Sequence, residues 1–349
     1  DRELAIYKKL IKLGVSISFI TYGQSEDLKY KNKLNGINIL CNKWHLNNKF
    51  YCKYIHLIHW RFLYNCDIIK TNQANGSEIA IRAANFWKKP LIGRMGYLWS
   101  EFVSKEQNNN IRISQIQDIE NKLYDFSSKL IVTTDLMAKS IIKFQNKIKV
   151  VPNYVETNHF KPDDSIKKDF DILFIGRLSH QKNFINLLKV INSLDIKVLV
   201  IGDGELRNEM QVVHNNLNGR VKWITKVPNF DLPKYLNRSR IFILPSLYEG
   251  HPKVLIEAMS CGLAIIGSDV SGINNIINHN QNGRLCKLSV QSMINEIQLL
   301  LDNKDLRISL GKNAHKYAIN KFSLDKVIDL EFSIYKEIVS NKKINEVLD

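Results

Sequence analysis

The 349-residue sequence lacks the marks of several classes of protein. Its five cysteines are an odd number with no C-x-x-C pair, which favours reduced thiols over a disulfide framework. No stretch approaches the roughly 18 consecutive apolar residues of a membrane span, and no signal-peptide pattern is seen at the start. No tract is rich in proline, glycine or serine, so disorder is not expected. These absences favour a cytoplasmic globular protein, which could meet a membrane only at its surface.

Acidic residues are scarce in the first part of the chain. Residues 1–150 hold 24 Lys and Arg against 12 Asp and Glu, so this part carries +12 of the whole chain's net charge of +16. Such a field attracts an anionic membrane, a nucleic acid or an acidic substrate, while the same charges on solvated helix faces would only aid solubility. Because the basic residues are dispersed and no nucleic-acid-binding module is recognisable, we expect no nucleic acid. Peripheral contact with the inner face of a cell membrane stays open.

Short apolar strands alternate with longer amphipathic segments along the whole chain. This rhythm predicts an α/β protein with parallel sheets and helices on both faces, and the length predicts two domains. A polar stretch at residues 161–169 is the expected linker. We therefore expect one domain over residues 1–160, a second over 161–322, and a final helix in 323–349 that packs back toward the first domain.

The segment from Leu244 to Gly262 is the most informative part of the sequence. A strand ends at Pro245, a loop with Glu249 and Gly250 follows, and Pro252 suits the first turn of a helix. The backbone N–H groups of Lys253 and Val254 at that helix start form a site for an anion such as a diphosphate.

Two glutamates flank this helix start. Glu257 lies one turn beyond Lys253 in an apolar helix, where an exposed acid is not expected, and its carboxylate suits the vicinal hydroxyls of a ribose. Glu249 suits the hydroxyls of a sugar on the other side of the phosphates, or is simply a solvated loop acid. A second segment, from Asp171 to Asn183, places Gly176, Arg177 and Lys182 after a strand and before a helix.

These motifs resemble glycosyltransferase family 4, whose hallmark is two glutamates separated by seven residues after a proline-serine strand end. The resemblance implies the GT-B fold, with two Rossmann-like, doubly wound domains facing a central cleft. It implies that Arg177 and Lys182 grip the donor diphosphate, and fixed cations at that place would stabilise the charge that develops on the leaving group.

Other segments also match the family. The stretch around Gly202 resembles a strand-to-helix turn beside the nucleotide, although it fails as a dinucleotide fingerprint because Arg207 stands where the third glycine would fall. The stretch around Val227 resembles the loop next to the nucleobase. We expect Arg177, Lys182 and Glu249 to act in catalysis. The expected donor-binding residues are Gly176, Arg177, Lys182, Gly202, Val227, Glu249, Gly250, His251, Pro252, Lys253, Val254 and Glu257.

The first domain matches the family less closely. Relatives open with a strand and a glycine-rich loop ahead of the helix at residues 4–13, so the natural start is expected to lie upstream of Asp1. Many members carry a catalytic histidine where this sequence has Met95. The polar candidates on the acceptor side are Asn72, Gln73, Arg94 and Tyr97, with a plain ion pair as the alternative for Arg94.

The sequence thus predicts a glycosyltransferase, of hexosyltransferase type, that serves polysaccharide biosynthesis. It would move a sugar from a nucleoside-diphosphate donor to a glycan or lipid-linked acceptor hydroxyl, without a metal or other cofactor, and the resemblance implies retention at the anomeric carbon. The Asp-x-Asp of metal-dependent transferases is represented only by Asp169-Phe170-Asp171, which precedes its strand. A nucleotide-sugar epimerase of the same fold and a nucleic-acid-binding protein are the alternatives.

Overall fold

The computed structural model describes residues 2–106, 109–217 and 219–348. The chain divides into two compact units. The carboxyl-terminal unit comprises Pro152–Val327 together with Arg2, and the amino-terminal unit comprises Glu3–Val151 and the residues from Ile328 onward. Each unit is described separately below.

The carboxyl-terminal unit is built on a sheet of six parallel strands in the order β12-β11-β10-β7-β8-β9. Its strands are β7 (Phe170–Ile175), β8 (Val198–Ile201), β9 (Val221–Ile224), β10 (Ser239–Leu244), β11 (Ala264–Ser268) and β12 (Arg284–Cys286). From β7 the chain builds outward through β8 and β9, and it then returns to β10 on the other side of β7. The connection order therefore reverses between β7 and β10, as in a doubly wound sheet.

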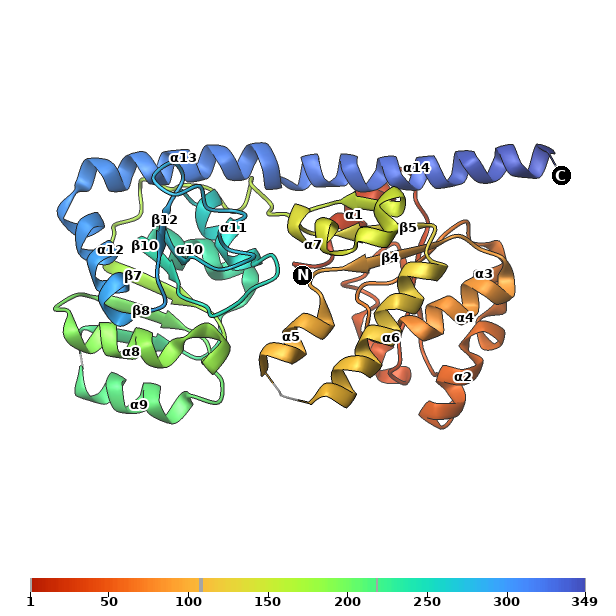
Figure 1. Cartoon of the computed structure of the whole chain (residues 1–349), viewed down its shortest axis with the longest axis horizontal. Helices are drawn as coiled ribbons and strands as arrows, with labels where there is room; N and C mark the ends of the chain where they lie inside the picture. Colours follow the sequence, from red (N-terminus) through yellow and green to blue (C-terminus); the bar gives the residue numbers. More distant parts are fainter. Residues whose placement is uncertain (1, 107–108, 218, 349) are drawn as a thin grey trace. The chain divides into compact units, whose positions relative to one another are not determined.

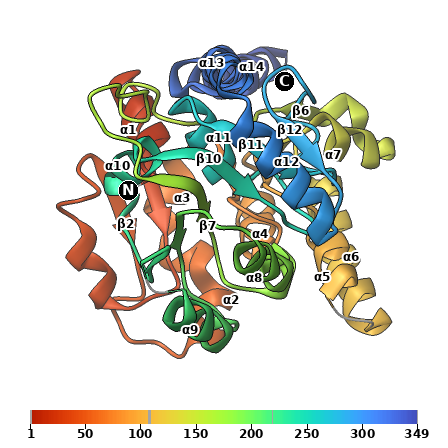
Figure 2. The ribbon, with the colours of Figure 1, turned by 90° about the vertical axis from the view of Figure 1, so that its left-hand side faces the viewer.

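Helices cover both faces of this sheet, as Figures 1 and 2 show. They are α8 (Phe184–Ser193), α9 (Arg207–Asn216), α10 (Leu232–Asn237), α11 (Lys253–Ser260), α12 (Val290–Asp302) and α13 (Lys304–Phe322), with the short 3₁₀ helices η3 (His180–Lys182) and η4 (Asn229–Asp231). Strand β10 has fully buried side chains on both faces, since Ile241 and Phe242 are both inaccessible to solvent. Continuous apolar strands of this kind are expected where helices cover both faces.

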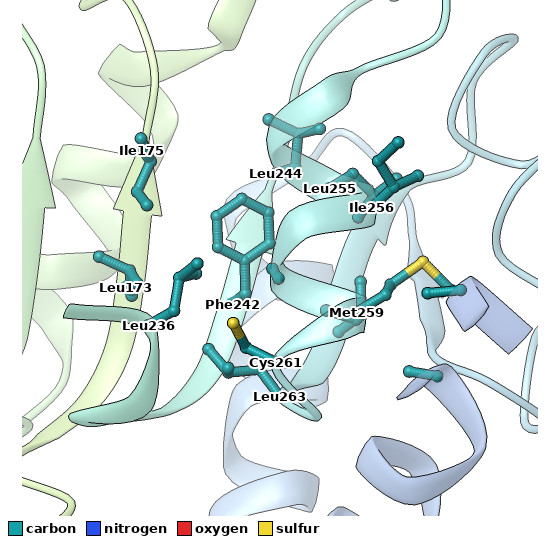
Figure 3. Packing of buried hydrophobic residues seen from close by; sticks show 14 of the residues in the cluster. Leu173, Ile175, Leu236, Phe242, Leu244, Leu255, Ile256, Met259, Cys261 and Leu263 are labelled. Atoms are coloured by element: carbon teal, nitrogen blue, oxygen red, sulfur yellow. The ribbon is translucent and has the colours of Figure 1, made fainter. Parts of the chain in front are cut away.

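The core of this unit consists of two clusters, one on each face of the sheet. In one cluster, Leu255 and Met259 of α11 join Phe242 of β10 and Leu173 of β7 (Figure 3). In the other, side chains of α8, α9 and α12 pack against the opposite face. The helix that starts at Lys253 is thus held by its own apolar face, which fixes the position of its first turn.

The strands of the amino-terminal unit lie in two parallel sheets. One pairs β1 (Ile17–Ile20) with β2 (Ile37–Leu40), and the other has the order β3 (Ile69–Lys70), β4 (Leu91–Met95), β5 (Lys129–Val132) and β6 (Ile148–Val150). The helices are α1 (Ala5–Lys12), α2 (Asn48–Ile58), α3 (Trp60–Asn65), α4 (Ser77–Trp87), α5 (Trp99–Glu106), α6 (Asn110–Phe126) and α7 (Asp135–Ser140), with 3₁₀ helices η1 (Ser25–Tyr30) and η2 (Ile142–Lys147).

The last helix, α14 (Leu324–Leu348), contributes most of its length to the amino-terminal unit. Buried Glu331 pairs with Lys70 of β3, and Glu337 pairs with Lys129 of β5 at 2.5 Å. Lys70 and Lys129 are each in register with Ile92. Because residues in register on neighbouring strands point to the same face of a sheet, the two lysines share a face. That cationic face is neutralised by the acids of α14.

The division between the units differs from the expected one at 160/161 and falls between Val151 and Pro152. Val155 and Phe160 are buried in the core of the carboxyl-terminal unit, and Val155 donates its N–H to the carbonyl of Phe322. The chain therefore already belongs to the carboxyl-terminal unit at Val155, before the polar stretch at 161–169.

Candidate functional site

Both sequence motifs lie at the carboxyl edge of the β7–β10 pair. The loop after β7 carries Gly176, Arg177 and Lys182, and the loop after β10 carries Glu249 and Gly250. Doubly wound sheets bind their ligands outside the carboxyl ends of the strands, at the point where the connection order reverses. The topology therefore brings the two motifs to the edge at which such a site is expected.

An ion pair joins the two loops directly, because Lys182 Nζ contacts Glu249 Oε1. The Lys182 side chain is 16% exposed and that of Glu249 is 8% exposed, so the pair is largely shielded from water. The Ser246 hydroxyl donates to the same Glu249 oxygen at 2.7 Å. Glu249 is therefore a held carboxylate rather than a solvated loop acid.

Backbone and amide hydrogen bonds reinforce this connection. The Leu247 N–H donates to the Gln181 carbonyl at 2.8 Å, and the Gln181 side-chain amide donates to the Tyr248 carbonyl at 3.2 Å. Sequence reasoning missed Ser246 and Gln181, although both lie inside the quoted motifs. The signal that could have identified both as site residues is that their side chains are polar.

Two glycines allow the backbone to pass close to this site. Gly202 has a φ of +151°, and a Cβ there would lie 1.8 Å from the Gly176 carbonyl oxygen. Gly272 has a φ of +85°, and its Cβ would lie 2.4 Å from the Glu249 carbonyl oxygen. Side chains at these positions would collide with backbone, so only glycine permits this packing of the two loops.

Glu257 lies inside α11 and is 2% exposed. Its two carboxylate oxygens accept from the Arg2 guanidinium, with Nε to Oε1 at 2.7 Å, and the Asn229 amide donates to Oε1 at 3.0 Å. Burial raises the pKa of the Glu257 carboxyl, while the Arg2 and Asn229 contacts oppose that rise. The Arg2 guanidinium donates two N–H groups to the Glu257 carboxylate, just as a vicinal diol would donate two O–H groups. The Glu257 carboxylate is therefore arranged to bind a bidentate partner.

Helix α11 begins at Lys253, directly after Pro252, and no described side chain caps it. The Lys253 ammonium lies 5.6 Å from the centre of the Tyr154 ring. His251 is buried, and its carbonyl accepts from the Asn153 side chain at 2.7 Å. A helix start that has no side-chain cap and is held in position by these contacts is suited to bind an anion.

The remaining donor-side residues differ in exposure. Arg177 is exposed and forms no ion pair with any residue that the structure describes, so its guanidinium is available to a ligand. Gly250 and Val254 are half-buried beside the helix start, and half-buried Val227 packs against the core. The structure brings Lys182 onto Glu249 and Asn229 onto Glu257, whereas Arg177 has neither glutamate as a partner.

The acceptor-side candidates belong to the amino-terminal unit. Asn72 is exposed, Gln73 accepts from the Gly96 N–H at 3.2 Å, and the Tyr97 ring lies 4.5 Å from that of Phe102. Arg94 is half-buried, and its charge helps to lower the pKa of Glu331.

Neither of two further kinds of site was found in the part of the chain that the structure describes. There, no three His, Cys, Asp or Glu side chains are grouped so that they could hold a metal ion. Residues 2–106, 109–217 and 219–348 also include no helix with the length and apolarity needed to cross a bilayer.

Solved structures define the fold class as GT-B. The Anabaena protein HepE, solved in complex with UDP, aligns with a TM-score of 0.78 over 92% of each chain at 16% identity. The same protein solved with UDP-glucose aligns with a TM-score of 0.76 over 91% of each chain, also at 16% identity. At this identity the likeness establishes the architecture of two Rossmann-like units.

The sequence is similar to glycosyltransferases. Residues 155–317 match the family described as glycosyl transferases group 1. An Escherichia coli UDP-Gal:alpha-D-GlcNAc-diphosphoundecaprenol alpha-1,3-galactosyltransferase is 32% identical over 56% of this chain and 56% of its own length. The Bacillus anthracis N-acetyl-alpha-D-glucosaminyl L-malate synthase is 29% identical over 59% of this chain and 58% of its own length. The chain thus matches little more than half the length of these relatives.

Proposed function

We propose that this protein transfers a glycosyl unit from a nucleoside-diphosphate sugar to an acceptor hydroxyl. The observation that carries the proposal is the Lys182–Glu249 pair at the carboxyl edge of the β7–β10 switch point. Exposed Arg177 lies in the same loop as Lys182, and α11 begins four residues after Glu249. A diphosphate placed there would meet two cations and a helix N-terminus.

The reaction breaks the bond between the anomeric carbon and the donor phosphate, and it forms a bond from that carbon to the acceptor oxygen. The acceptor hydroxyl gives its proton to the departing diphosphate or to water, and the diphosphate leaves with added negative charge. Arg177, Lys182 and the N–H groups at the start of α11 would stabilise that charge as it develops, so we propose a reaction without a metal. Glu249 would orient the sugar hydroxyls, and Glu257 the ribose, with Arg2 displaced by the ribose.

The relatives suggest which substrates to test first. The Escherichia coli relative is named for UDP-Gal and a diphosphoundecaprenol-linked acceptor, and HepE was solved with UDP-glucose. We propose a UDP-sugar as donor and a saccharide, free or lipid-linked, as acceptor. Retention at the anomeric carbon is part of the same proposal.

The test is incubation of the full chain with a panel of nucleoside-diphosphate sugars, with and without saccharide acceptors, followed by mass spectrometry of the products. We expect release of one nucleoside diphosphate together with an acceptor that is heavier by one sugar. Conversion of the donor into an epimer with no diphosphate released would favour the epimerase. A panel with neither product and no binding of any donor would contradict the proposal.

A further inference from the structure

A group of exposed apolar side chains lies on α2, α3 and the end of α4 in the amino-terminal unit. Six large apolar side chains there are unusually accessible: Phe50 is 50% exposed, Leu57 43%, Trp60 49%, Phe62 44%, Tyr64 58% and Phe86 53%. We call these six residues the aromatic surface. Scattered single exposed hydrophobics need no explanation, but a gathered set of this size indicates an interaction site.

The helices that carry the aromatic surface, α2, α3 and α4, contact one another (Figure 1). The Tyr64 ring lies 5.7 Å from the ring of Trp87, which in turn lies 4.9 Å from that of Phe86. Phe86 then lies 5.0 Å from the ring of His56 on α2. Rings from three helices thus meet edge to face across the surface.

The charge on α2 and α3 has one sign. These two helices contain Lys49, Lys53 and Arg61 and no Asp or Glu. Three cations sit on the rings themselves: Lys53 lies 5.4 Å from the centre of Tyr54, Arg61 5.5 Å from Trp60, and Lys89 5.6 Å from Tyr64. The aromatic surface is therefore interleaved with positive charge; α2 and α3 carry no acid, and α4 carries Glu78 in its first turn.

We propose that the aromatic surface and its cations dock the protein on an anionic phospholipid bilayer. Tryptophan and tyrosine favour the headgroup level of a membrane, and lysine and arginine beside them are attracted to anionic lipid. Leu57 lies one turn beyond Lys53 on the same face of α2, where it gains from burial in hydrocarbon.

A single-stranded nucleic acid is the other polyanion that basic and aromatic residues can bind, since its bases stack on rings. Aliphatic Leu57 offers no stacking, and Tyr64 and Phe86 are already engaged edge to face with Trp87. A bilayer would therefore contact more of these side chains than a single-stranded nucleic acid would. The surface holds no residue of the donor site, so the docking can be true or false independently of glycosyl transfer.

The experiment is sedimentation of the full chain with vesicles of phosphatidylcholine alone and of phosphatidylcholine mixed with phosphatidylglycerol. We expect binding to the mixed vesicles that weakens as salt is added. The triple variant Lys49→Glu, Lys53→Glu, Arg61→Glu should lose at least about tenfold in vesicle affinity, because each cation near the lipid contributes to the attraction. The matched control reverses three exposed lysines of α13, Lys312, Lys316 and Lys321, and should retain more of the binding.

A second pair of variants separates apolar insertion from charge. Phe50→Ser with Trp60→Ser should also weaken vesicle binding, whereas Ile111→Ser with Ile142→Ser, at positions 75% and 79% exposed, should leave it unchanged. Circular dichroism establishes that each variant is folded. Absence of binding to the mixed vesicles, equal losses in surface and control variants, or binding to single-stranded RNA in place of vesicles would each overturn the proposal.

Discussion

Lys182 and Glu249 form a shielded ion pair although 67 residues separate them in the chain. Lys182 ends the loop after β7, and Glu249 lies in the loop after β10, so the pair joins the two strands at which the sheet reverses its connection order. In the free protein the acid holds the cation in place. A bound diphosphate would compete with Glu249 for the same ammonium group. Because that ammonium is already held in place, the pair is a preorganised cation site.

The two glutamates should have separable effects on binding. Glu257→Ala should weaken the affinity for free UDP, because we assign Glu257 to the ribose. Glu249→Ala releases the Lys182 ammonium, so it should alter UDP affinity less than Glu257→Ala does and should mainly weaken the discrimination between UDP-sugar and UDP. Isothermal titration calorimetry of both variants with UDP and with the UDP-sugar substrate is the measurement, and a reversed pattern would show that the roles are assigned the wrong way round.

Gly202 should tolerate no side chain. Because a Cβ at this position would lie 1.8 Å from the Gly176 carbonyl oxygen, Gly202→Ala must push β7 and β8 apart at the donor edge. Gly219 supplies the control, since it also has a positive φ, of +87°, but its Cβ would meet nothing within 4 Å. Gly219→Ala should cost about 1 to 2 kcal/mol and Gly202→Ala clearly more than about 3 kcal/mol. Urea unfolding measures both, and equal losses would contradict the crowding argument.

The buried Lys70–Glu331 pair should stabilise the docking of α14. The Lys70 side chain is 14% exposed and that of Glu331 is 2% exposed, and the Tyr335 hydroxyl donates to Glu331 at 2.5 Å. Lys70→Met leaves a buried carboxylate without its cation and should destabilise the protein by about 3 to 5 kcal/mol. Adding Glu331→Leu should restore much of the loss, and failure of the double variant to recover would show that the pair does not act as a unit.

The same pair should make stability depend on pH. The Lys70 ammonium and the Tyr335 hydroxyl hold the pKa of Glu331 below its usual range, against the effect of burial. A lowered folded-state pKa contributes stability that is fully present above the unfolded pKa of about 4.3 and is lost as the pH falls through the folded value. Between about pH 5 and pH 3 the native chain should lose more stability than the Lys70→Met, Glu331→Leu variant. Parallel losses would assign the acid sensitivity to other carboxylates.

The sequence predicted much of the carboxyl-terminal unit because its local signals agree with one another. Strands ending at Ile175 and Leu244 and helices starting at Phe184 and Lys253 all lie within a few residues of the expected bounds. Glu257 could be expected to be buried because its neighbours in α11 are apolar. The short strands β9 and β12 were missed, since Val221–Ile224 and Arg284–Cys286 are too brief for a clear pattern.

The amino-terminal unit was harder to predict for physical reasons. The apolar stretch at residues 50–64 is two helices that meet at His59, and periodicity alone does not reveal such a break. The ion pairs of α14 with Lys70 and Lys129 join residues more than 200 positions apart, as the separation of 261 between Lys70 and Glu331 illustrates. Likewise the engagement of Glu257 by Arg2 and Asn229 depends on tertiary structure that leaves no local pattern.

The most direct test of the donor site compares Lys182→Ala with Lys189→Ala, which removes an exposed lysine from the neighbouring helix α8. Turnover of the full chain with its donor and acceptor should fall by about 100-fold or more for Lys182→Ala, as for the loss of one preorganised transition-state contact. Lys189→Ala should retain native turnover. Native turnover in Lys182→Ala, with the variant folded, would contradict the assignment of this lysine to the leaving diphosphate.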